Sequence, residues 1–466
     1  MNRSLYRLLM WAAWIMMSWF VASQIIRFNK MTVIMAFILS ALILSFLRID
    51  WAIVLLVFLC PFHYVLKEMY PSIYTDIWRE IFLACLLVSW FIQVIAKKLP
   101  APSKNVLNNV IIGYLMWGIL EIFRSVNLLI GLAGFRFMFP FIPLYFVALS
   151  VFETKEKIGK YVNAILISGF IAGIIGVIQF ITVSLLHVVT PGSSIIFANK
   201  YVNMSSKLGL YRAVSVLASD NEFGALMVVG VLFLLVFIFY YPEYRKRHYK
   251  KAVFAILIMF AALLFSMSRS AMLGLGAGIL AINVLKVRMK MILCTSFIVI
   301  LLIMLLPFAA KGLFGPVFTL SDDYFLVTLN RHWDLFLQSP LWGHGFFITQ
   351  SVADKLRIST AVNLVGGIDI DFFHIANQIG LIGFLLHSLI WFLFLKAAYL
   401  GAKSPILSDE YRAVSAAIFG ILVAFKVMSL HLTVWDYVSI ACTYYLLGAI
   451  ATFIYIKSKE VLVEKA

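Results

Sequence analysis

Three arginines lie in polar segments between long apolar runs, where their chemistry suits the binding of an anion. Arg212 follows the polar stretch that begins near Val188, Arg269 lies between two serines, and Arg331 lies in the longest polar loop. A planar guanidinium engages two phosphate oxygens at once, which makes arginine well suited to hold a diphosphate. The simpler interpretation of any one of these arginines is an interfacial anchor whose charged end reaches water. Together they predict a diphosphate site.

The anchor interpretation is kept for four other arginines, Arg27, Arg79, Arg124 and Arg136. Lys426 lies well inside an apolar run. We expect its amine either to extend to the same interface or to pair with a carboxylate such as Asp436, and we favour the interface.

Carboxylates and an imidazole near the end of the longest polar loop are candidates for a general base. They are Asp369, Asp371 and His374, just before an apolar run. Asp369-Ile370-Asp371 also resembles the Asp-x-Asp pattern that holds a divalent cation through oxygen ligands. Carboxylates at a helix N-terminus are equally explained by the helix dipole. The cysteines lie inside apolar runs without metal-ligand spacing, and we expect no metal or other cofactor.

Two further histidines in this loop are candidates for contact with a sugar. His332 follows Arg331 in a segment, Phe325–Gln338, whose apolar residues recur at helical spacing. Such a segment predicts an amphipathic helix resting on the membrane surface or on the bundle. His344 lies between two glycines, a pattern typical of a tight turn. The simpler interpretation of both histidines is that they are surface residues.

The composition shows which elements must position these residues. The chain has 466 residues, of which 63% are hydrophobic and 13% charged, and its mean hydropathy is +1.01. Apolar runs of about 20 residues, each long enough to span a bilayer as a helix, follow one another along the chain. We therefore expect an all-α, polytopic membrane helix bundle of about 12–14 transmembrane helices. The expected helices are Leu5–Ile26, Met31–Leu47, Trp51–Leu66, Ile77–Ala96, Val106–Phe123, Phe137–Val151, Tyr161–His187, Glu222–Tyr240, Ala252–Met267, Ala271–Leu285, Met291–Phe308, Ile375–Lys396, Tyr411–Leu430 and Tyr437–Ile456.

The distribution of basic residues predicts the orientation, because cytoplasmic loops collect lysine and arginine. It places both termini in the cytoplasm, and it places Arg212, Arg269 and the loop 309–374 on the outer face. The net charge of +17 follows from this topology, so a nucleic-acid partner is not expected. The basic run Tyr244–Lys251 is expected to contact anionic membrane lipids. We predict one integral membrane domain, residues 1–466, with a functional core over residues 211–390.

Four segments, in this order, resemble those of the O-antigen ligase and polymerase superfamily. The similar motifs are "R…g…pN.fa", "tfSRga", "R…W…(x)PllGvG" and "elGliG". In this chain they correspond to Tyr211–Phe223, Leu263–Ala271, Arg331–Gly345 and Gly380–Gly383. The resemblance covers roughly Tyr211 to Ile390, and the residues before it add only compatible hydropathy.

The resemblance implies a GT-C-like inverting glycosyltransferase at the outer face of a bacterial inner membrane. Its donor would be a glycan carried on undecaprenyl diphosphate. By motif, the diphosphate-binding arginines of the family fall on Arg212 and Arg269, and Arg331 is our further candidate. Whether a chain-length regulator is also a partner is left open.

The chain departs from the ligase pattern at one place. Ligases usually have His-Asn about eleven residues before the "GliG" glycine, where this chain has Asp369-Ile370. Either His374 serves as the base from another register, or Asp369 or Asp371 takes that role. We therefore favour a polysaccharide polymerase that joins repeat units over an O-antigen ligase that transfers them to lipid A core.

A transporter or flippase is a weaker alternative. Transporters place their binding groups near the bilayer midplane, between pseudo-symmetric halves with broken helices. The sequence has few ionisable residues inside its apolar runs and shows no convincing repeat.

Overall fold

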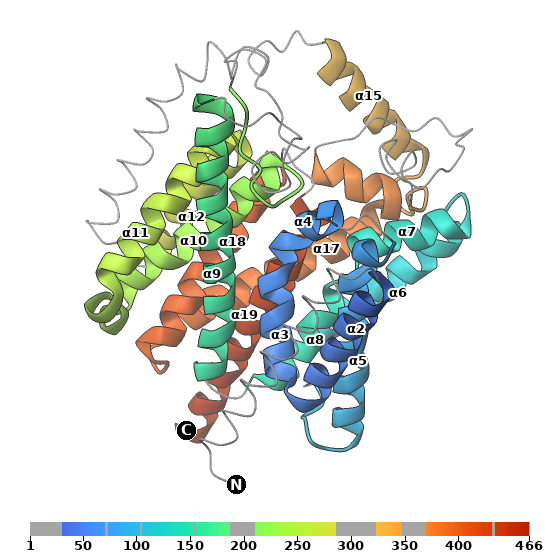
Figure 1. Cartoon of the computed structure of the whole chain (residues 1–466). Helices are drawn as coiled ribbons and strands as arrows, with labels where there is room; N and C mark the ends of the chain where they lie inside the picture. Colours follow the sequence, from blue (N-terminus) through green and yellow to red (C-terminus); the bar gives the residue numbers. More distant parts are fainter. Residues whose placement is uncertain are drawn as a thin grey trace.

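The computed structural model describes residues 30–69, 73–102, 105–152, 155–186, 210–285, 323–346, 370–430 and 434–465. Within these ranges the chain is helical and forms no β-strand (Figure 1). Nine of the described helices are long and apolar enough to cross a membrane, or ten if one bent pair counts as a single span. The expectation of a polytopic membrane helix bundle is confirmed.

The first half of the bundle comprises eight α-helices and two short helical segments. In chain order they are α2 (Lys30–Leu47), α3 (Ile49–Leu59), η1 (Cys60–Phe62), α4 (His63–Met69), α5 (Ile73–Ile95), α6 (Val106–Arg124), α7 (Leu128–Met138), α8 (Ile142–Val151), α9 (Lys155–Gln179) and the π-helical η2 (Phe180–Leu185). The second half comprises α10 (Asp220–Tyr240), α11 (Pro242–Ser266), α12 (Arg269–Leu285), α15 (Asp323–Gln338), α17 (Asp371–Lys403), α18 (Asp409–Met428), η4 (Val434–Asp436) and α19 (Val438–Lys465).

Helix α10 lies at the centre of the second half. It is apolar on every side, and 89% of its most apolar stretch is buried in the protein. Helices α9, α11, α12, α18 and α19 all pack against it. A helix that is hydrophobic all round belongs in the interior of a bundle. The two ends of α10 are therefore the places where polar groups can gather.

Two predicted spans are wrong in detail. The run Phe137–Val151 is divided between α7 and α8, which meet at an angle of 42°. Pro140 lies at this break, and proline in a helix interior removes a backbone donor and clashes with the preceding turn. The run Ile375–Lys396 belongs to a longer helix, α17, which is interrupted at Ile379 and Gly380.

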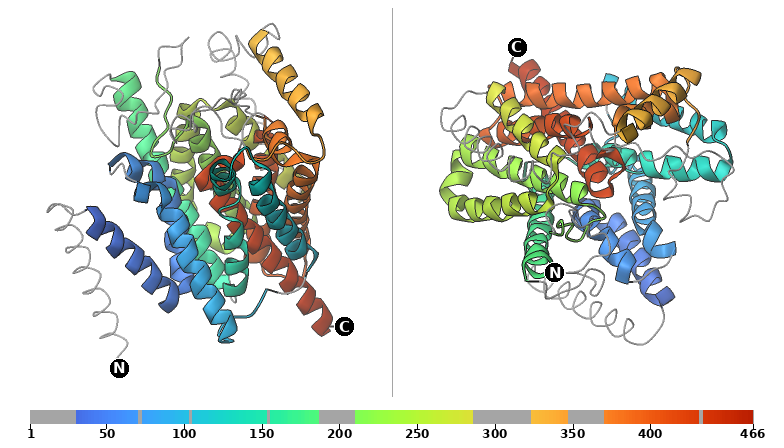
Figure 2. Two further views of the ribbon diagram at one scale, coloured as in Figure 1. Left: turned by 90° about the vertical axis from the view of Figure 1, so that its right-hand side faces the viewer. Right: turned by 90° about the horizontal axis from the view of Figure 1, so that it is seen from above.

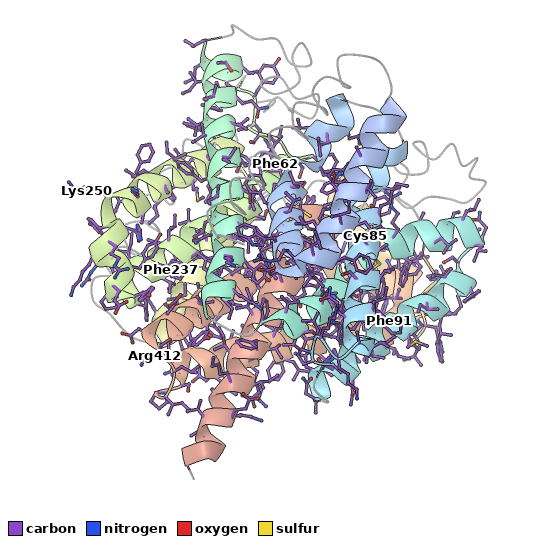
Figure 3. The ribbon with its side chains drawn as sticks, turned by 60° about the horizontal axis from the view of Figure 1, so that its bottom comes forward. Phe62, Cys85, Phe91, Phe237, Lys250 and Arg412 are labelled. Carbon is purple, nitrogen blue, oxygen red and sulfur yellow. The ribbon has the colours of Figure 1, made fainter. Side chains whose placement is uncertain are left out.

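The two ends of the bundle differ in composition. The start of α10, the break between α11 and α12, and α15 lie at the upper end in Figure 1. α15 confirms the predicted amphipathic helix and packs against α17. Basic residues gather where α11 and α18 begin and α19 ends, and the C-terminus that follows α19 lies at the lower end of the bundle in the left-hand view of Figure 2. Figure 3 shows two of them, Lys250 and Arg412, on the periphery of the bundle.

Candidate functional site

The segment that carries Arg212 is fixed between two helices. The Gln179 Oε1 atom, at the end of α9, accepts hydrogen bonds from the backbone N–H groups of Val214 and Ser215, at 2.9 and 2.8 Å. On the other side, the Ala213 N–H donates to the carbonyl of Phe265, near the end of α11. Ala213, Val214 and Ser215 are thus tied to the bundle, which fixes the backbone directly after Arg212.

The side chain of Arg212 is oriented by the start of α10. Its Nη1 atom lies 2.9 Å from Asp220 Oδ2, and the Asp220 side chain is buried. Ser219 caps this helix by accepting a hydrogen bond from the Glu222 N–H. A charge-assisted hydrogen bond to a buried carboxylate holds a guanidinium in one orientation.

Arg269 begins α12 directly after a sharp reversal of the chain. α11 ends at Ser266, and Met267 adopts a left-handed conformation with φ of 52°. The Ser268 Oγ atom donates to Asn221 Oδ1 at 2.7 Å, which connects the reversal to α10. The Ser268-Arg269-Ser270 segment therefore lies at a break between two helices and is hydrogen-bonded to Asn221, the residue that follows Asp220.

These connections bring two of the predicted arginines together. The guanidinium groups of Arg212 and Arg269 lie close enough for their positive charges to repel each other. Two cations within electrostatic reach of each other, one held through its side chain and the other through its backbone, suit an anion with several oxygens.

The third residue at the start of α10 reaches a different helix. Glu222 is buried, and its Oε1 atom accepts hydrogen bonds from the hydroxyl and the N–H of Ser439, on α19. Asp220, Asn221 and Glu222 therefore contact, in turn, Arg212, the Ser268 reversal and α19. The sequence marked this segment as family-like but did not show these three partners.

The Gly343-His344-Gly345 pattern forms the predicted tight turn, and both glycines have positive φ. The turn fits into the break in α17. The N–H of Leu381 donates to the carbonyl of Pro340 at 2.8 Å, and a Cβ atom on Gly380 would overlap the carbonyl of Leu341. Only a glycine at position 380 leaves room for the Leu341 carbonyl and readily adopts the non-helical backbone found there, so α17 is interrupted at this residue.

Both candidate sugar-contacting histidines help to hold this turn and α15 in place. His332 is buried, rather than on the surface, and its carbonyl accepts a hydrogen bond from Asn377 Nδ2. His344 is half-buried, and its Nε2 atom lies 2.8 Å from the carbonyl of Leu335. Arg331 lies on α15, but its side chain is outside the described residues, as is the whole of Asp369.

Asp371 begins α17 and lies near the end of α18. Its N–H donates to the Ser429 carbonyl, and its carboxylate interacts electrostatically with Lys426. The Lys426 amine also lies 5.5 Å from the centre of the Phe384 ring, a cation–π arrangement. Lys426 thus faces α17, and its predicted extension to the interface stays a prediction. The side chain of Asp436, its other suggested partner, lies outside the described residues.

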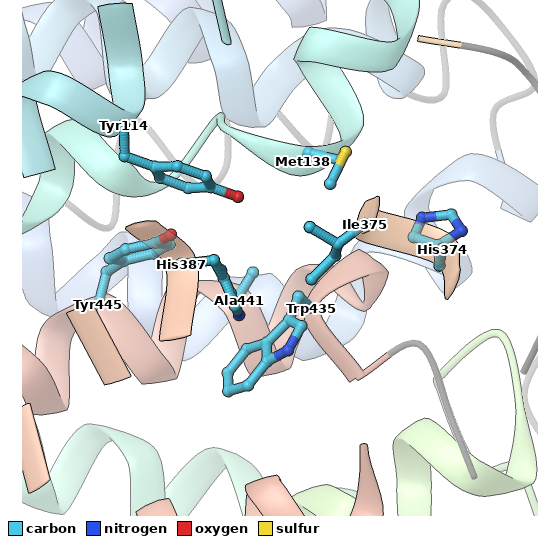
Figure 4. A pocket seen from close by; sticks show the side chains of 8 residues that line it. All are labelled: Tyr114, Met138, His374, Ile375, His387, Trp435, Ala441 and Tyr445. Carbon is cyan, nitrogen blue, oxygen red and sulfur yellow. The ribbon is translucent and has the colours of Figure 1, made fainter. Parts of the chain in front are cut away.

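His374, one turn after Asp371, lines a cavity inside the bundle (Figure 4). Gln378 Nε2 lies 3.2 Å from its Nε2 atom. Figure 4 shows Tyr114 and Tyr445 on the far side of the cavity from His374, with His387 and Trp435 between them. The cavity also includes Ala441, two residues after the Ser439 that bonds Glu222. The start of α19 therefore lines the cavity that contains His374 and also bonds α10, the helix whose Asp220 orients Arg212.

Two arginines assigned to the interface occupy a different environment. Arg79, on α5, is buried, and Arg136, on α7, lies 2.7 Å from Glu80 Oε1. Both line a second cavity, which adjoins the first at Trp435 and Ala441. The anchor interpretation is wrong for Arg79. The signal available in the sequence was a carboxylate, Glu80, next to Arg79 in an otherwise apolar run.

Arg124 is also more than an anchor. It pairs with Glu121 and donates to the carbonyls of Trp342 and Gly343, at 2.7 and 3.2 Å. This arginine therefore fixes the glycine turn to α6.

A search among curated proteins finds no significant match to this chain. A family model described as O-antigen ligase matches residues 254–388, which include the helix break at Arg269, α15, the glycine turn and the start of α17. Members of this family are glycosyltransferase-like ligases and polymerases that act on lipid-linked glycans in membranes. This match over the region from the end of α11 to α17 confirms the resemblance to the O-antigen ligase and polymerase superfamily.

Proposed function

We propose that this protein is a polysaccharide polymerase, an inverting glycosyltransferase that joins repeat units carried on undecaprenyl diphosphate. The growing glycan is the donor, and its lipid diphosphate is the leaving group. A hydroxyl group of a second lipid-linked repeat unit attacks the anomeric carbon of the donor. The glycosidic bond forms as the bond to the diphosphate breaks, and the hydroxyl proton passes to a base.

The observation that carries this proposal is the arginine pair at the break between α11 and α12. Arg212 is oriented by Asp220, and the backbone at Arg269 is fixed through Ser268 and Asn221. Donors fixed before the reaction stabilise charge as it develops, without reorganising at that moment. The charge develops on the departing diphosphate, and we assign its oxygens to Arg212 and Arg269. Arg331, from α15, is our third candidate for the same group.

We assign the base to the start of α17. His374 lines the cavity that adjoins the arginine end through α19, and an imidazole takes up a proton near neutral pH. Asp371, one turn earlier, and Asp369 are the alternatives. We place the acceptor glycan along the glycine turn, where half-buried His344 is our candidate contact. His332, which is buried, supports α15 in this arrangement.

The difference between the two ends of the bundle supports one orientation in the membrane. The lower end is rich in lysine and arginine, including the first turns of α11, and such ends face the cytoplasm. With this orientation the arginine pair faces the outer side of a bacterial inner membrane, where lipid-linked repeat units are presented. Both termini then lie in the cytoplasm.

An O-antigen ligase is the second candidate, favoured by the description of the matching family model. Its acceptor would be lipid A core. The polymerase is preferred because Asp369-Ile370 stands where the ligase pattern has His-Asn.

The test uses purified protein in detergent with a lipid-diphosphate-linked repeat unit, with and without lipid A core. A polymerase gives a ladder of products from the repeat unit alone. The ladder disappears in Arg269→Gln and persists in Arg412→Gln, a control that changes an exposed arginine paired with Asp409 at the opposite end. Transfer only in the presence of lipid A core would instead establish a ligase. No transfer with either acceptor would refute the glycosyltransferase proposal.

A further inference from the structure

A second pair of arginines lines a cavity that adjoins the proposed site. Arg79 comes from α5 and Arg136 from α7, and the aromatic residues Phe137, Phe141 and Trp435 form much of the remaining wall. The free space between these side chains is small, about 10 Å³, so an anionic group larger than a water molecule enters only when the surrounding side chains move apart.

One carboxylate serves both arginines of this pair. Glu80 Oε1 lies 3.4 Å from Arg79 Nη2 and 2.7 Å from Arg136 Nε. The neighbouring Asp76 carboxylate is taken by Lys67, at 2.5 Å. Among these direct contacts, the guanidinium groups of Arg79 and Arg136 therefore share the single negative charge of Glu80.

Arg79 retains binding capacity inside the bundle. Its side chain is 8% exposed, and its Nε atom is buried without a hydrogen-bond partner among the described residues. Glu222 attracts it electrostatically, but the Glu222 oxygens already accept bonds from Ser439 and Ala218. Buried charged groups normally have all their donors occupied, so an unoccupied donor on an arginine that lines a cavity points to a ligand.

We infer that Arg79 and Arg136 form a second anion subsite, which takes the lipid diphosphate of the acceptor. This inference rests on the proposed function. A polymerase holds two lipid-linked diphosphates at once, one on the growing chain and one on the incoming repeat unit. The pair Arg212 and Arg269 takes the first. The second subsite adjoins the His374 cavity through Trp435 and Ala441, so the acceptor glycan extends from its diphosphate toward the base.

The subsite therefore lets the polymerase select acceptors that carry a lipid diphosphate. A repeat unit without the diphosphate lacks the group that Arg79 and Arg136 hold. A ligase whose acceptor is lipid A core has no second undecaprenyl diphosphate to bind in this place.

The test counts bound lipid by native mass spectrometry of the full-length protein with undecaprenyl diphosphate as the probe. The wild-type protein is expected to bind two molecules. Arg136→Gln and Arg269→Gln are each expected to retain one, and the double variant none. The control is Arg48→Gln, which changes an arginine also paired with a carboxylate, Asp50, but outside both cavities.

Folding is checked separately, because removing Arg136 leaves Glu80 with one partner. The charge-matched double variant Glu80→Gln with Arg136→Gln avoids the unpaired carboxylate and is also expected to bind one molecule. A different result would overturn the second subsite and leave the proposed function intact. In that result the wild-type protein binds one molecule of undecaprenyl diphosphate, Arg136→Gln still binds it, and Arg269→Gln does not. Binding of no molecule at all would count against both.

A turnover assay then identifies the source of the anion. The donor is a lipid-linked repeat unit whose acceptor hydroxyl is removed, and the acceptors are the same repeat unit on undecaprenyl diphosphate or on an uncharged alkyl chain. The wild-type protein is expected to prefer the diphosphate acceptor at least about 10-fold, and Arg136→Gln to lose this preference. If Arg136→Gln slowed both acceptors equally, the pair would serve a charged sugar or the fold instead.

Discussion

The two arginine pairs of this protein are held in different ways. Arg212 and Arg269 lie at breaks between helices, and separate groups fix them, Asp220 for the first and the Ser268 reversal for the second. Arg79 and Arg136 lie within helices and share Glu80. A pair with separate supports keeps its geometry when its ligand leaves. A pair that shares one carboxylate is held together mainly by that carboxylate.

The largest expected effect is the loss of catalysis in Arg269→Gln. Because this residue is assigned to the leaving diphosphate, its removal is expected to lower kcat by at least about 100-fold, the usual cost of losing one fixed donor to developing charge. Arg136→Gln is expected to raise the KM for the acceptor and to change kcat far less. Initial rates over a range of acceptor concentrations measure both. Equal losses of kcat in the two variants would remove the distinction between the pairs.

A smaller effect is expected from Gly224→Ala, which tests the dependence of Arg269 on helix packing. The new Cβ atom would lie 2.8 Å from Ala271 Cβ and 3.0 Å from Ser268 Cβ, so α10 would push the reversal away. Overpacking of this kind costs about 1–3 kcal/mol. Thermal unfolding in detergent measures the loss. Gly276→Ala is the control, because its Cβ would meet nothing within 4 Å; the expectation is wrong if both variants unfold at the same temperature.

Asp220→Asn is expected to weaken donor binding about 10-fold, or about 1.4 kcal/mol, because the Arg212 guanidinium loses its charged partner. The amide is nearly the same size, so the fold is retained. Binding of undecaprenyl diphosphate measures the effect. Glu80→Gln serves as the comparison and is expected to leave donor binding by the Arg212 pair unchanged. Equal weakening by the two variants would show that the two pairs act as one.

The smallest effect is expected from Ser268→Ala. It removes the 2.7 Å hydrogen bond to Asn221 together with the longer contacts of the same hydroxyl, 3.3 Å to Ser270 Oγ and 3.4 Å from the Ala271 N–H. One hydrogen bond contributes about 0.5–1.5 kcal/mol, and the 2.7 Å bond is expected to dominate. The expected result is a modest fall in kcat with little change in the KM for the acceptor. Ser40→Ala, which removes a hydroxyl bonded within its own helix α2, is the control. A Ser268→Ala enzyme with unchanged kcat would show that the Arg269 backbone needs no such support.

The membrane bundle, the amphipathic α15 and the glycine turn could be predicted from sequence, because hydropathy, helical spacing and glycine pairs are local signals. The Arg212 and Arg269 segments could be identified from family-like motifs. The burial of Arg79 was missed, because its one signal is the adjacent Glu80, and an arginine near the start of an apolar run otherwise looks the same whether it faces lipid or the bundle interior. The break at Gly380 was also missed, since its cause is the backbone of Leu341, far away in the sequence.

The bond between Glu222 and Ser439 has a consequence for how the protein is made. Its two residues are 217 positions apart, and the helix that carries Ser439 is the last one described. While the ribosome is still adding the residues between them, α10 has neither its final neighbour nor a partner for this carboxylate. The arginine end can therefore be completed only after α19 has been synthesised. A chain released before α19 was made would carry every candidate diphosphate-binding residue. The carboxylate of Glu222 on α10 would still lack its partner Ser439, so the cell's quality control would meet an incompletely folded bundle.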